Sequence, residues 1–175
     1  MEYFKNENDV YFAKLKDKAI IPSKEDENAG YDIYACFDED YIILKESETK
    51  LIPTGIMWAC CPSFYLQLEE RSSTGTKGIK RSAGIIDSGY RGEIKVAITN
   101  VTGKDLIFSN LSEEQLREKY KEDISENALI YMTTKAITQG VIHRVEKMNI
   151  KEISAEELLK IPSKRQDKGW GSTNK

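Results

Sequence analysis

Histidine is almost absent from this sequence of 175 residues, which contains only His143. A single histidine nearly excludes a histidine-rich zinc site and a Ser-His-Asp catalytic triad. A hard metal ion such as Mg²⁺ is held by carboxylate, water and phosphate oxygens and needs no histidine. Metal chemistry with oxygen ligands therefore stays open.

Cysteine is scarce as well, with three residues, two of them adjacent. An odd count gives no disulfide framework and favours free thiols in a reducing, intracellular compartment, which we expect to be the cytoplasm. Residues 1–10 are acidic and polar, unlike a signal peptide. The most apolar run, residues 51–61, is too short to span a bilayer and is interrupted by Pro53 and Gly55, so we expect no membrane association.

The sequence also lacks an excess of positive charge, since 26 Lys and Arg against 29 Asp and Glu give a net charge of −3. Proteins that bind a nucleic-acid backbone are normally basic, so we expect no nucleic-acid polymer as partner. A local cluster of Arg and Lys can still hold a small anion. The composition, 39% hydrophobic and 31% charged, is typical of one globular domain with its own core.

Short runs of β-branched and aromatic residues between turn residues make up most of the chain. They predict strands at residues 31–36, 41–44, 50–54, 56–60, 64–68, 92–99 and 136–145. Many short strands with irregular connections indicate an all-β fold, either a sandwich, a jelly roll or a distorted β-barrel.

Two capping boxes predict short helices. Residues 112–115 (Ser-Glu-Glu-Gln) begin a helix expected at 113–121, and residues 154–157 (Ser-Ala-Glu-Glu) begin a second that Pro162 stops. In each box the first side chain accepts a backbone hydrogen bond that the helix leaves unmade. Both helices are therefore expected to be short and locally encoded.

The charged segment 104–129 is interpreted as a helical insertion between two strands. It is either an interaction surface for a protein partner or a solvated surface helix. We expect residues 1–162 to form a single β domain. Residues 163–175 have almost no aliphatic side chains and are expected to form a flexible tail.

Three polar segments are candidates for chemistry. Residues 71–75 (Arg-Ser-Ser-Thr-Gly) combine forked donors, hydroxyls and a glycine, as in a phosphate cradle, although a polar turn has the same composition. Asp87 lies before a Ser-Gly turn, where its carboxylate either takes a proton from water or accepts turn hydrogen bonds. Tyr90, three residues on, either faces a ligand or packs on the sheet.

The third candidate is the tail. Trp170 can stack on a planar base, which contributes roughly 1–3 kcal/mol per base. Arg165 and the hydroxyls of Ser172 and Thr173 can bind a terminal phosphate. The alternative is a disordered end of the chain.

Taken in order, these segments resemble the conserved motifs of the trimeric, all-β deoxyuridine triphosphatase (dUTPase) family. The third and fifth motifs are the most specific, and the fourth is a degraded form. Its first to fifth motifs are matched in order by residues 29–33, 71–73, 84–92, 135–139 and 165–173. Residues 53–55 resemble the family segment that follows the first motif.

The resemblance implies hydrolysis of dUTP to dUMP and pyrophosphate. Asp87 would orient and deprotonate the water that attacks the α-phosphorus, and Tyr90 would lie against the deoxyribose and exclude a 2′-hydroxyl. The backbone around Gly84 and Ile86 would pair with the uracil edge. Asp32 would contact Mg²⁺ through water.

The resemblance also implies a homotrimer whose sites are shared between subunits. Arg71, Ser72 and Gln139 would hold the α and β phosphates, while the tail would close over the γ-phosphate with Trp170 over the uracil. The substrate-binding residues outside the hairpin would be Arg71, Ser72, Ser73, Gln139, Arg165, Trp170, Gly171, Ser172 and Thr173.

Two features leave alternatives open. Arg81 stands where some relatives place an Asn that reads the base, so the strictness of uracil over cytosine selection is undecided. The related dCTP deaminases carry a Glu shortly after the third motif, where this chain has Ala97, which argues against deamination. A regulatory binding protein on the same scaffold is the remaining alternative.

Overall fold

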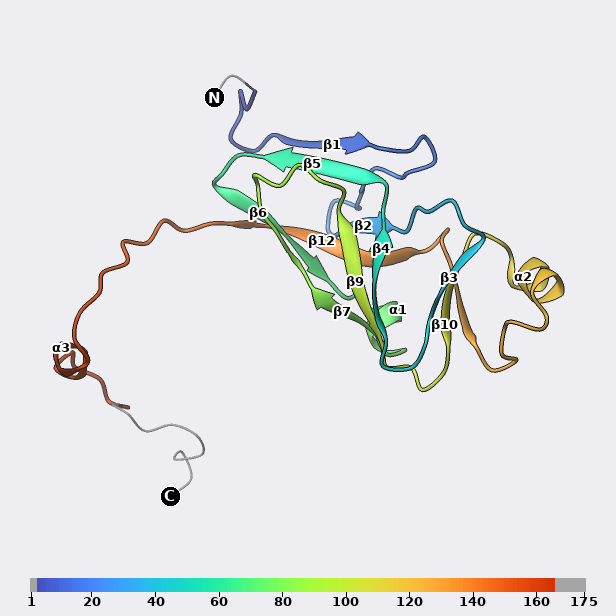
Figure 1. Cartoon of the computed structure of the whole chain (residues 1–175). Coiled ribbons are helices and arrows are strands. Elements are labelled where there is room, and N and C mark those ends of the chain that lie inside the picture. Colours follow the sequence, from blue (N-terminus) through green and yellow to red (C-terminus); the bar gives the residue numbers. More distant parts are fainter. Residues whose placement is uncertain (1–2, 166–175) are drawn as a thin grey trace. The chain divides into compact units, whose positions relative to one another are not determined.

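The computed structural model describes residues 3–165 (Figure 1). By its internal contacts the chain divides into a unit of residues 1–145 and a unit of residues 146–175. The strands of the described residues all belong to the first unit. No helix among residues 3–165 is long and apolar enough to cross a membrane.

The first unit is built almost entirely of short strands. Their bounds are β1 (Val10–Lys14), β2 (Tyr31–Tyr34), β3 (Tyr41–Leu44), β4 (Thr49–Pro53), β5 (Ile56–Cys60), β6 (Phe64–Glu69), β7 (Ile79–Ala83), β8 (Ile85–Ile86), β9 (Lys95–Asn100), β10 (Leu106–Ser109), β11 (Leu129–Met132) and β12 (Ala136–Arg144).

These strands form four sheets, ordered β1-β5, β11-β10-β3, β2-β12-β6-β8 and β4-β9-β7. Within the described part of the first unit the sheets pack face to face without closing into a barrel (Figure 1). The expectation of an all-β, jelly-roll-like fold is confirmed. Such packing buries one face of strands such as β5 and leaves the other for solvent or a ligand, whereas β10 is buried on both faces.

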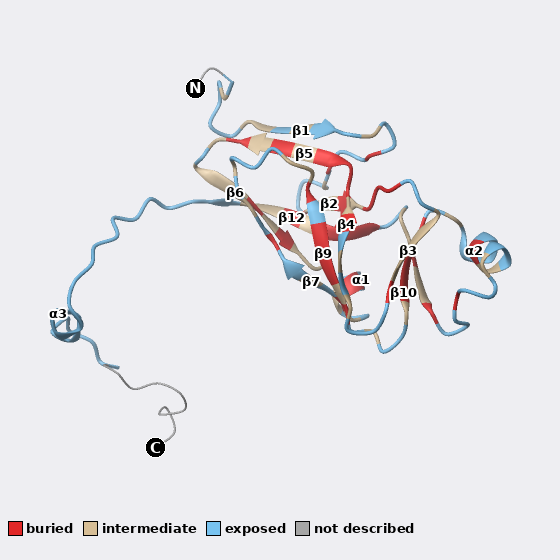
Figure 2. Ribbon diagram, in the orientation of Figure 1, coloured by how far each residue is buried: buried red, intermediate tan, exposed pale blue. Residues whose placement is uncertain are grey.

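The larger of two buried apolar clusters lies between the sheets, and strands from every sheet contribute to it (Figure 2). In β5, Ile56, Trp58 and Cys60 are buried while the residues between them are partly exposed, as the two-residue period of a strand requires. Burial of the Cys60 thiol raises its pKa to about 11. All three cysteines are free, as the sequence indicated.

Strands β3 and β5 have the predicted bounds, and the other predicted strands differ by a few residues at their ends. Five strands, β1, β7, β8, β10 and β11, were not predicted. Residues 72–75 form a short helix, α1 (Ser72–Gly75), rather than an irregular turn. The capping boxes of α2 (Glu113–Lys119) and α3 (Ala155–Leu159) are confirmed, with both reciprocal hydrogen bonds present in each.

The segment interpreted as a helical insertion has two parts. Its residues 106–109 are β10, the central strand of the β11-β10-β3 sheet, where Leu106, Ile107 and Phe108 are fully buried. Helix α2 then crosses back to β11, and Leu116 on it packs against Ile107. Only α2 and its flanking loops are therefore added outside the sheet.

The second unit contains α3, and the apolar side chains along it are exposed.

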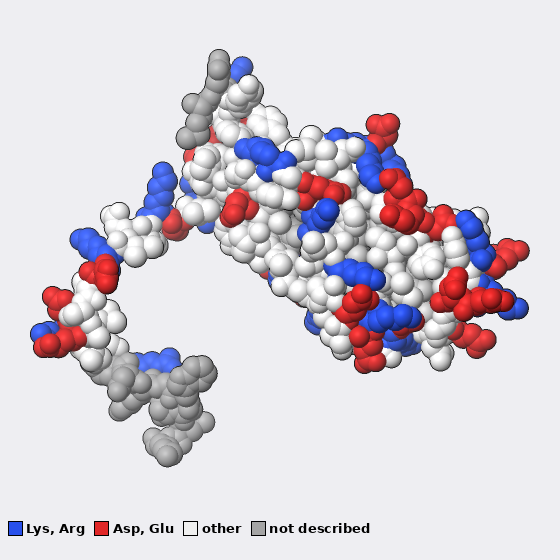
Figure 3. All heavy atoms as spheres, viewed as in Figure 1, with Lys and Arg blue, Asp and Glu red and all other residues white. Residues whose placement is uncertain are grey.

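On the face of the molecule seen in Figure 3, acidic and basic side chains are interspersed. This arrangement is consistent with the nearly balanced charge of the sequence.

Candidate functional site

A polar pocket of about 410 Å³ lies where the loop before β2, the helix α1 and the strand β12 meet. We call it the anion pocket. It brings together four predicted site residues from distant parts of the sequence, Arg71, Ser72, Ser73 and Gln139, together with Asp32. Its complete lining is Asn28, Ala29, Gly30, Asp32, Arg71, Ser72, Ser73 and Gln139.

Arg71 is held rigidly at the wall of the anion pocket. Its Nε lies 2.9 Å from one carboxylate oxygen of Asp32, and its Nη2 lies 3.3 Å from the other. Nη1 donates to the carbonyl of Ala136 at 3.2 Å. Such a bidentate ion pair fixes the plane of the guanidinium, so the Arg71 side chain is already oriented towards the pocket before a ligand binds.

Gln139 is placed by the sheet itself. It lies opposite Asp32 on β2 and opposite Glu69 on β6. Its Nε2 donates to the carbonyl of Glu70 at 2.8 Å. Gly30 leaves room for this side chain, since a Cβ there would lie 2.5 Å from the Gln139 Oε1.

A second pocket, of about 310 Å³, lies beside the segment that follows β8. We call it the hairpin pocket. Asp87 is exposed there, and its carbonyl accepts the backbone N–H of Tyr90 at 3.1 Å in a tight turn. The complete lining is Leu51, Ile85, Ile86, Asp87, Tyr90, Glu93 and Lys95.

The Tyr90 side chain is anchored but accessible. Its hydroxyl donates to the carbonyl of Glu93 at 3.0 Å, and 46% of the residue is exposed. Glu93 in turn accepts the N–H of Gly55 at 2.9 Å, which ties the segment to the turn between β4 and β5. The aromatic ring of Tyr90 is therefore accessible to a ligand, while its hydroxyl group is fixed by the hydrogen bond.

Gly84 and Ile86 lie on the edge of the β2-β12-β6-β8 sheet. Ile86 pairs with Leu66, and the carbonyl of Gly84 already accepts the N–H of Leu68 at 2.8 Å. The backbone that was predicted to read a base is therefore held in register by β6.

The two pockets share no lining residue. Arg71, Ser72, Ser73 and Gln139 line the anion pocket, while Asp87 and Tyr90 line the hairpin pocket. Among the tail residues of the prediction, Arg165 belongs to the second unit, while Trp170, Gly171, Ser172 and Thr173 lie outside the described residues.

Within residues 3–165 no group of three or more His, Cys, Asp or Glu side chains is arranged to hold a metal ion. Asp32 is the carboxylate of the anion pocket, and its side chain is 34% exposed. One carboxylate suits Mg²⁺, which keeps several waters and takes its other ligands from substrate phosphates. The residues present fit an ion that arrives with a polyphosphate.

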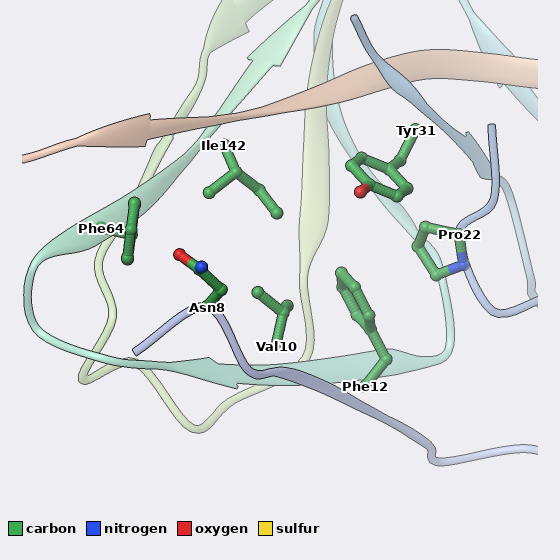
Figure 4. Close-up of a pocket in the computed structure, with 7 residues that line it drawn as sticks. All are labelled: Asn8, Val10, Phe12, Pro22, Tyr31, Phe64 and Ile142. Carbon is green, nitrogen blue, oxygen red and sulfur yellow. The ribbon is translucent and has the colours of Figure 1, made fainter. Parts of the chain in front are cut away.

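Another cavity, of about 380 Å³, lies among β1, β2, β6 and β12 (Figure 4). Its lining is Asn8, Val10, Phe12, Pro22, Tyr31, Phe64 and Ile142. No charged side chain lines it, so it offers nothing that would neutralise a phosphate chain.

Several pocket residues were not predicted from sequence. Lys95 looked like an ordinary solvent-facing position of a strand, and Leu51 looked like part of an apolar run. Glu93 ended the stretch 83–93 that was expected to form the heart of the site, but it was given no role of its own. Asn28 precedes a recognised motif by one residue, which was the only available signal. Their roles depend on which strands pair, and a single sequence does not show that.

The family model for dUTPase matches residues 16–110 of the chain. The deoxyuridine 5′-triphosphate nucleotidohydrolase of Leptospira interrogans is 33% identical over 105 residues, which cover 58% of this chain and 72% of that protein. The enzyme of the same name from Rickettsia bellii is 41% identical over 100 residues, covering 55% of this chain and 62% of that protein.

Solved structures show the same fold. The dUTPase of Staphylococcus bacteriophage 80alpha with dUpNHpp matches with a TM-score of 0.69 and 20% identity, covering 95% of this chain and 98% of that chain. The EIAV dUTPase matches with a TM-score of 0.58 and 23% identity, covering 83% and 97%. The family match, which spans both the anion pocket and the hairpin pocket except for Gln139, makes this chain a member of the dUTPase family.

Proposed function

We propose that the protein hydrolyses dUTP to dUMP and pyrophosphate. The observation that carries this proposal is the anion pocket, where Arg71 is oriented by Asp32 beside Ser72, Ser73 and Gln139. Forked N–H donors and hydroxyls suit the oxygens of a phosphate chain. The names of the relatives from Leptospira and Rickettsia support dUTP as the substrate.

Asp87 is the general base of the proposed reaction. Its exposed carboxylate takes a proton from a water molecule as the water oxygen attacks the α-phosphorus. The bond from the α-phosphorus to the bridging oxygen breaks, and pyrophosphate leaves with that electron pair. Arg71 and the serine hydroxyls stabilise the charge on the phosphate oxygens, so catalysis rests on positioning and electrostatics.

Tyr90 distinguishes deoxyribose from ribose. Its ring is held by the hydrogen bond to the Glu93 carbonyl, so it does not move aside readily for a 2′-hydroxyl. The sheet-bound backbone at Gly84 and Ile86 reads the uracil edge. Rigid backbone groups discriminate well, since a mismatched base leaves a buried donor or acceptor unpaired.

Mg²⁺ is the proposed cofactor, and Asp32 would hold it through water. A bacteriophage phi11 dUTPase is described with a structural Mg(II) ion. When bound, the ion neutralises part of the phosphate charge. Asp32 then serves two partners, because the same carboxylate orients Arg71.

The active site is proposed to be shared between subunits of a homotrimer. Within one chain the donors of the anion pocket and the Asp87 carboxylate line separate pockets. The anion pocket lacks the Asp87 carboxylate, and the hairpin pocket lacks the phosphate-binding side chains Arg71 and Gln139. A neighbouring copy supplies the other half if the hairpin pocket of one chain faces the anion pocket of the next.

The tail is proposed to complete the site. Residues 1–162 are taken as the β domain and residues 163–175 as the segment that closes over the substrate. In it, Arg165, Ser172 and Thr173 bind the γ-phosphate, and Gly171 lets the backbone approach. Trp170 stacks on the uracil.

A pyrophosphate-release assay against the common dNTPs and UTP, with Mg²⁺, tests the proposal. We expect release from dUTP and little from dCTP or UTP. Ammonia release from dCTP would instead identify a deaminase, although Ala97 is buried where a deaminase carries its Glu. A protein that binds dUTP without turnover would be a regulatory binding protein.

The compartment of the protein is proposed to be the reducing cytoplasm.

The exposed face of α2 is proposed as a surface for a protein partner. Removing residues 104–129 would not test the partner, because it would delete the buried strand β10. Charge reversal at Glu114 and Glu118, which are exposed on α2, is the better test. We expect dUTP turnover to survive it and partner binding to be lost.

A further inference from the structure

Arg81 on β7 has its guanidinium turned into the protein. Its side chain is only 18% exposed, and its Nη2 lies 3.4 Å from the Glu69 carboxylate. Its Nε is buried and has no hydrogen-bond partner among the described residues. Because a guanidinium stays charged and a buried N–H without an acceptor costs free energy, this placement requires a reason.

The guanidinium lies directly against Gly84. A Cβ at Gly84 would be 2.4 Å from Nη1 of Arg81 and 3.0 Å from its Cζ. The carbonyl of Gly84 accepts the N–H of Leu68 at 2.8 Å, which joins the start of the hairpin to β6. Arg81 therefore covers the joint between β6 and the segment that leads to Asp87.

A β-bulge turns Arg81 in this direction. Arg81 pairs with Ile98 and Ala83 pairs with Ala97, so the register between β7 and β9 shifts at Ser82. Bulges bend a strand and re-aim its side chains, and they are frequent beside active sites. Here the bulge directs the guanidinium towards β6, and Arg81 is not among the residues that line the hairpin pocket.

The same arginine is tied to the anion pocket through Glu70. The backbone N–H of Arg81 donates to the Glu70 carboxylate at 3.2 Å. The Glu70 carbonyl accepts the Nε2 of Gln139 at 2.8 Å, and Glu70 directly precedes Arg71. Contacts of one residue thus reach both the phosphate-binding elements and the hairpin.

We propose that Arg81 is a positioning residue, which clamps Gly84 against β6 through Glu69 and so fixes the approach of Asp87 to the attacking water. It does not read the base. The inference rests on the proposed function for its kinetic part, and it assigns to Arg81 a role different from that of the Asn in some relatives.

Hydrogen exchange of the Leu68 amide and steady-state kinetics test this assignment together. Arg81→Gln is the main variant, and Lys80→Gln, at the exposed neighbour on β7, is the matched control. In Arg81→Gln we expect exchange at Leu68 to be at least about tenfold faster and kcat for dUTP to fall about tenfold to a hundredfold. KM for dUTP should rise by a smaller factor, because the Gly84 backbone also lies at the proposed uracil edge. Lys80→Gln should match the wild type.

Glu69→Gln should lower kcat and add little to Arg81→Gln in the double variant, because the two residues act as a pair. Arg81→Lys, which keeps the charge beside Glu69, should recover part of kcat. These two variants also carry the test if Arg81→Gln does not fold.

Three outcomes would overturn the assignment. They are unchanged Leu68 exchange and kcat in Arg81→Gln, full additivity with Glu69→Gln, and a changed preference between dUTP and dCTP at unchanged kcat for dUTP. A wild-type protein without dUTP turnover would instead refute the proposed function, and Leu68 exchange would still decide whether the clamp exists.

Discussion

Arg71 and Gln139 illustrate how single side chains are prepared for a ligand by partners inside the protein. Arg71 is oriented by Asp32, and Gln139 is held by the carbonyl of Glu70. Among the described residues, Nη2 of Arg71 donates only to Asp32 and Nε2 of Gln139 only to Glu70, although each of these nitrogens carries two N–H groups. Because the ordering is complete before the substrate arrives, less entropy is lost on binding.

Replacing the proposed base isolates its chemical contribution. Asp87→Asn keeps the shape of an exposed side chain and removes the proton acceptor, so we expect kcat to fall about 100- to 10,000-fold with dUTP affinity nearly unchanged. Calorimetric titration with a non-hydrolysable dUTP analogue and a pyrophosphate assay measure the two quantities. Near-normal turnover would remove Asp87 from the role of base.

Gly30→Ala tests the placement of Gln139 by steric exclusion. The new Cβ would lie 2.5 Å from the Gln139 Oε1, so the amide must leave its position beside Glu70. We expect KM for dUTP to rise about tenfold, as for a lost hydrogen bond to a charged group. Gln139→Ala should raise KM similarly, and the double variant should be no worse than either single one. Additive losses would contradict this account.

At the scale of elements, α2 is stabilised by its local sequence, by packing of one side chain and by hydrogen bonds to a residue distant in the sequence. Ser112 and Gln115 cap its start, and Leu116 packs on β10. At its other end Asp40, in the loop before β3, accepts hydrogen bonds from Lys119 at 2.5 Å and from Tyr120 at 2.9 Å. The helix is therefore attached at both ends.

The Asp40 anchor should be sensitive to acid. Hydrogen bonds from Lys119 and then Tyr120 hold the pKa of Asp40 below its ordinary value. A depressed pKa means that the anchor stabilises the fold above the ordinary aspartate pKa of about 4 and is lost as the pH falls through the lower folded value.

We therefore expect Asp40→Asn to lower Tm at pH 7 and to make little difference near pH 2. The matched control is Glu114→Gln, a change of the same kind on the exposed face of α2. Thermal unfolding followed by circular dichroism at both pH values measures the effect. An equal loss at both would show that the charge of Asp40 is not what matters.

At the scale of the whole molecule, the separation of the anion pocket from the hairpin pocket predicts that inactive chains complement each other. Arg71→Gln and Asp87→Asn should each be nearly inactive alone. In mixed trimers, a site that takes Asp87 from one chain and Arg71 from the next is intact, so co-expression should restore about a quarter of wild-type activity. Absence of restored activity in verified mixed oligomers would mean that each site lies within one chain.

Truncation before Arg165 tests the tail. The strands and the core lie in the first unit, so the truncated protein should fold and assemble as the full chain does. Turnover of dUTP should nevertheless fall strongly, because the γ-phosphate and the uracil lose the contacts proposed for residues 165–173. Full activity of the truncated protein would refute closure by the tail.

Local patterns in the sequence predicted the local structure well. Short runs with β-branched or aromatic residues between turn residues predicted β3 and β5, and the capping boxes predicted the starts of α2 and α3, because these features depend on residues close together in the chain. The motif order was also enough to identify the family. Strand β10 was taken for part of an insertion, since its burial comes from β3 and β11, which are distant in sequence.

Pairing between distant strands decided the rest. It placed Gln139 beside Asp32 and Arg71, separated Asp87 from both, and turned Arg81 inward through a bulge that no local pattern announces. The sequence by itself determined which residues are available for the chemistry. Tertiary structure decided which of them meet, because a hydrogen bond of about 3 Å depends on strand register, and register is set by the whole core.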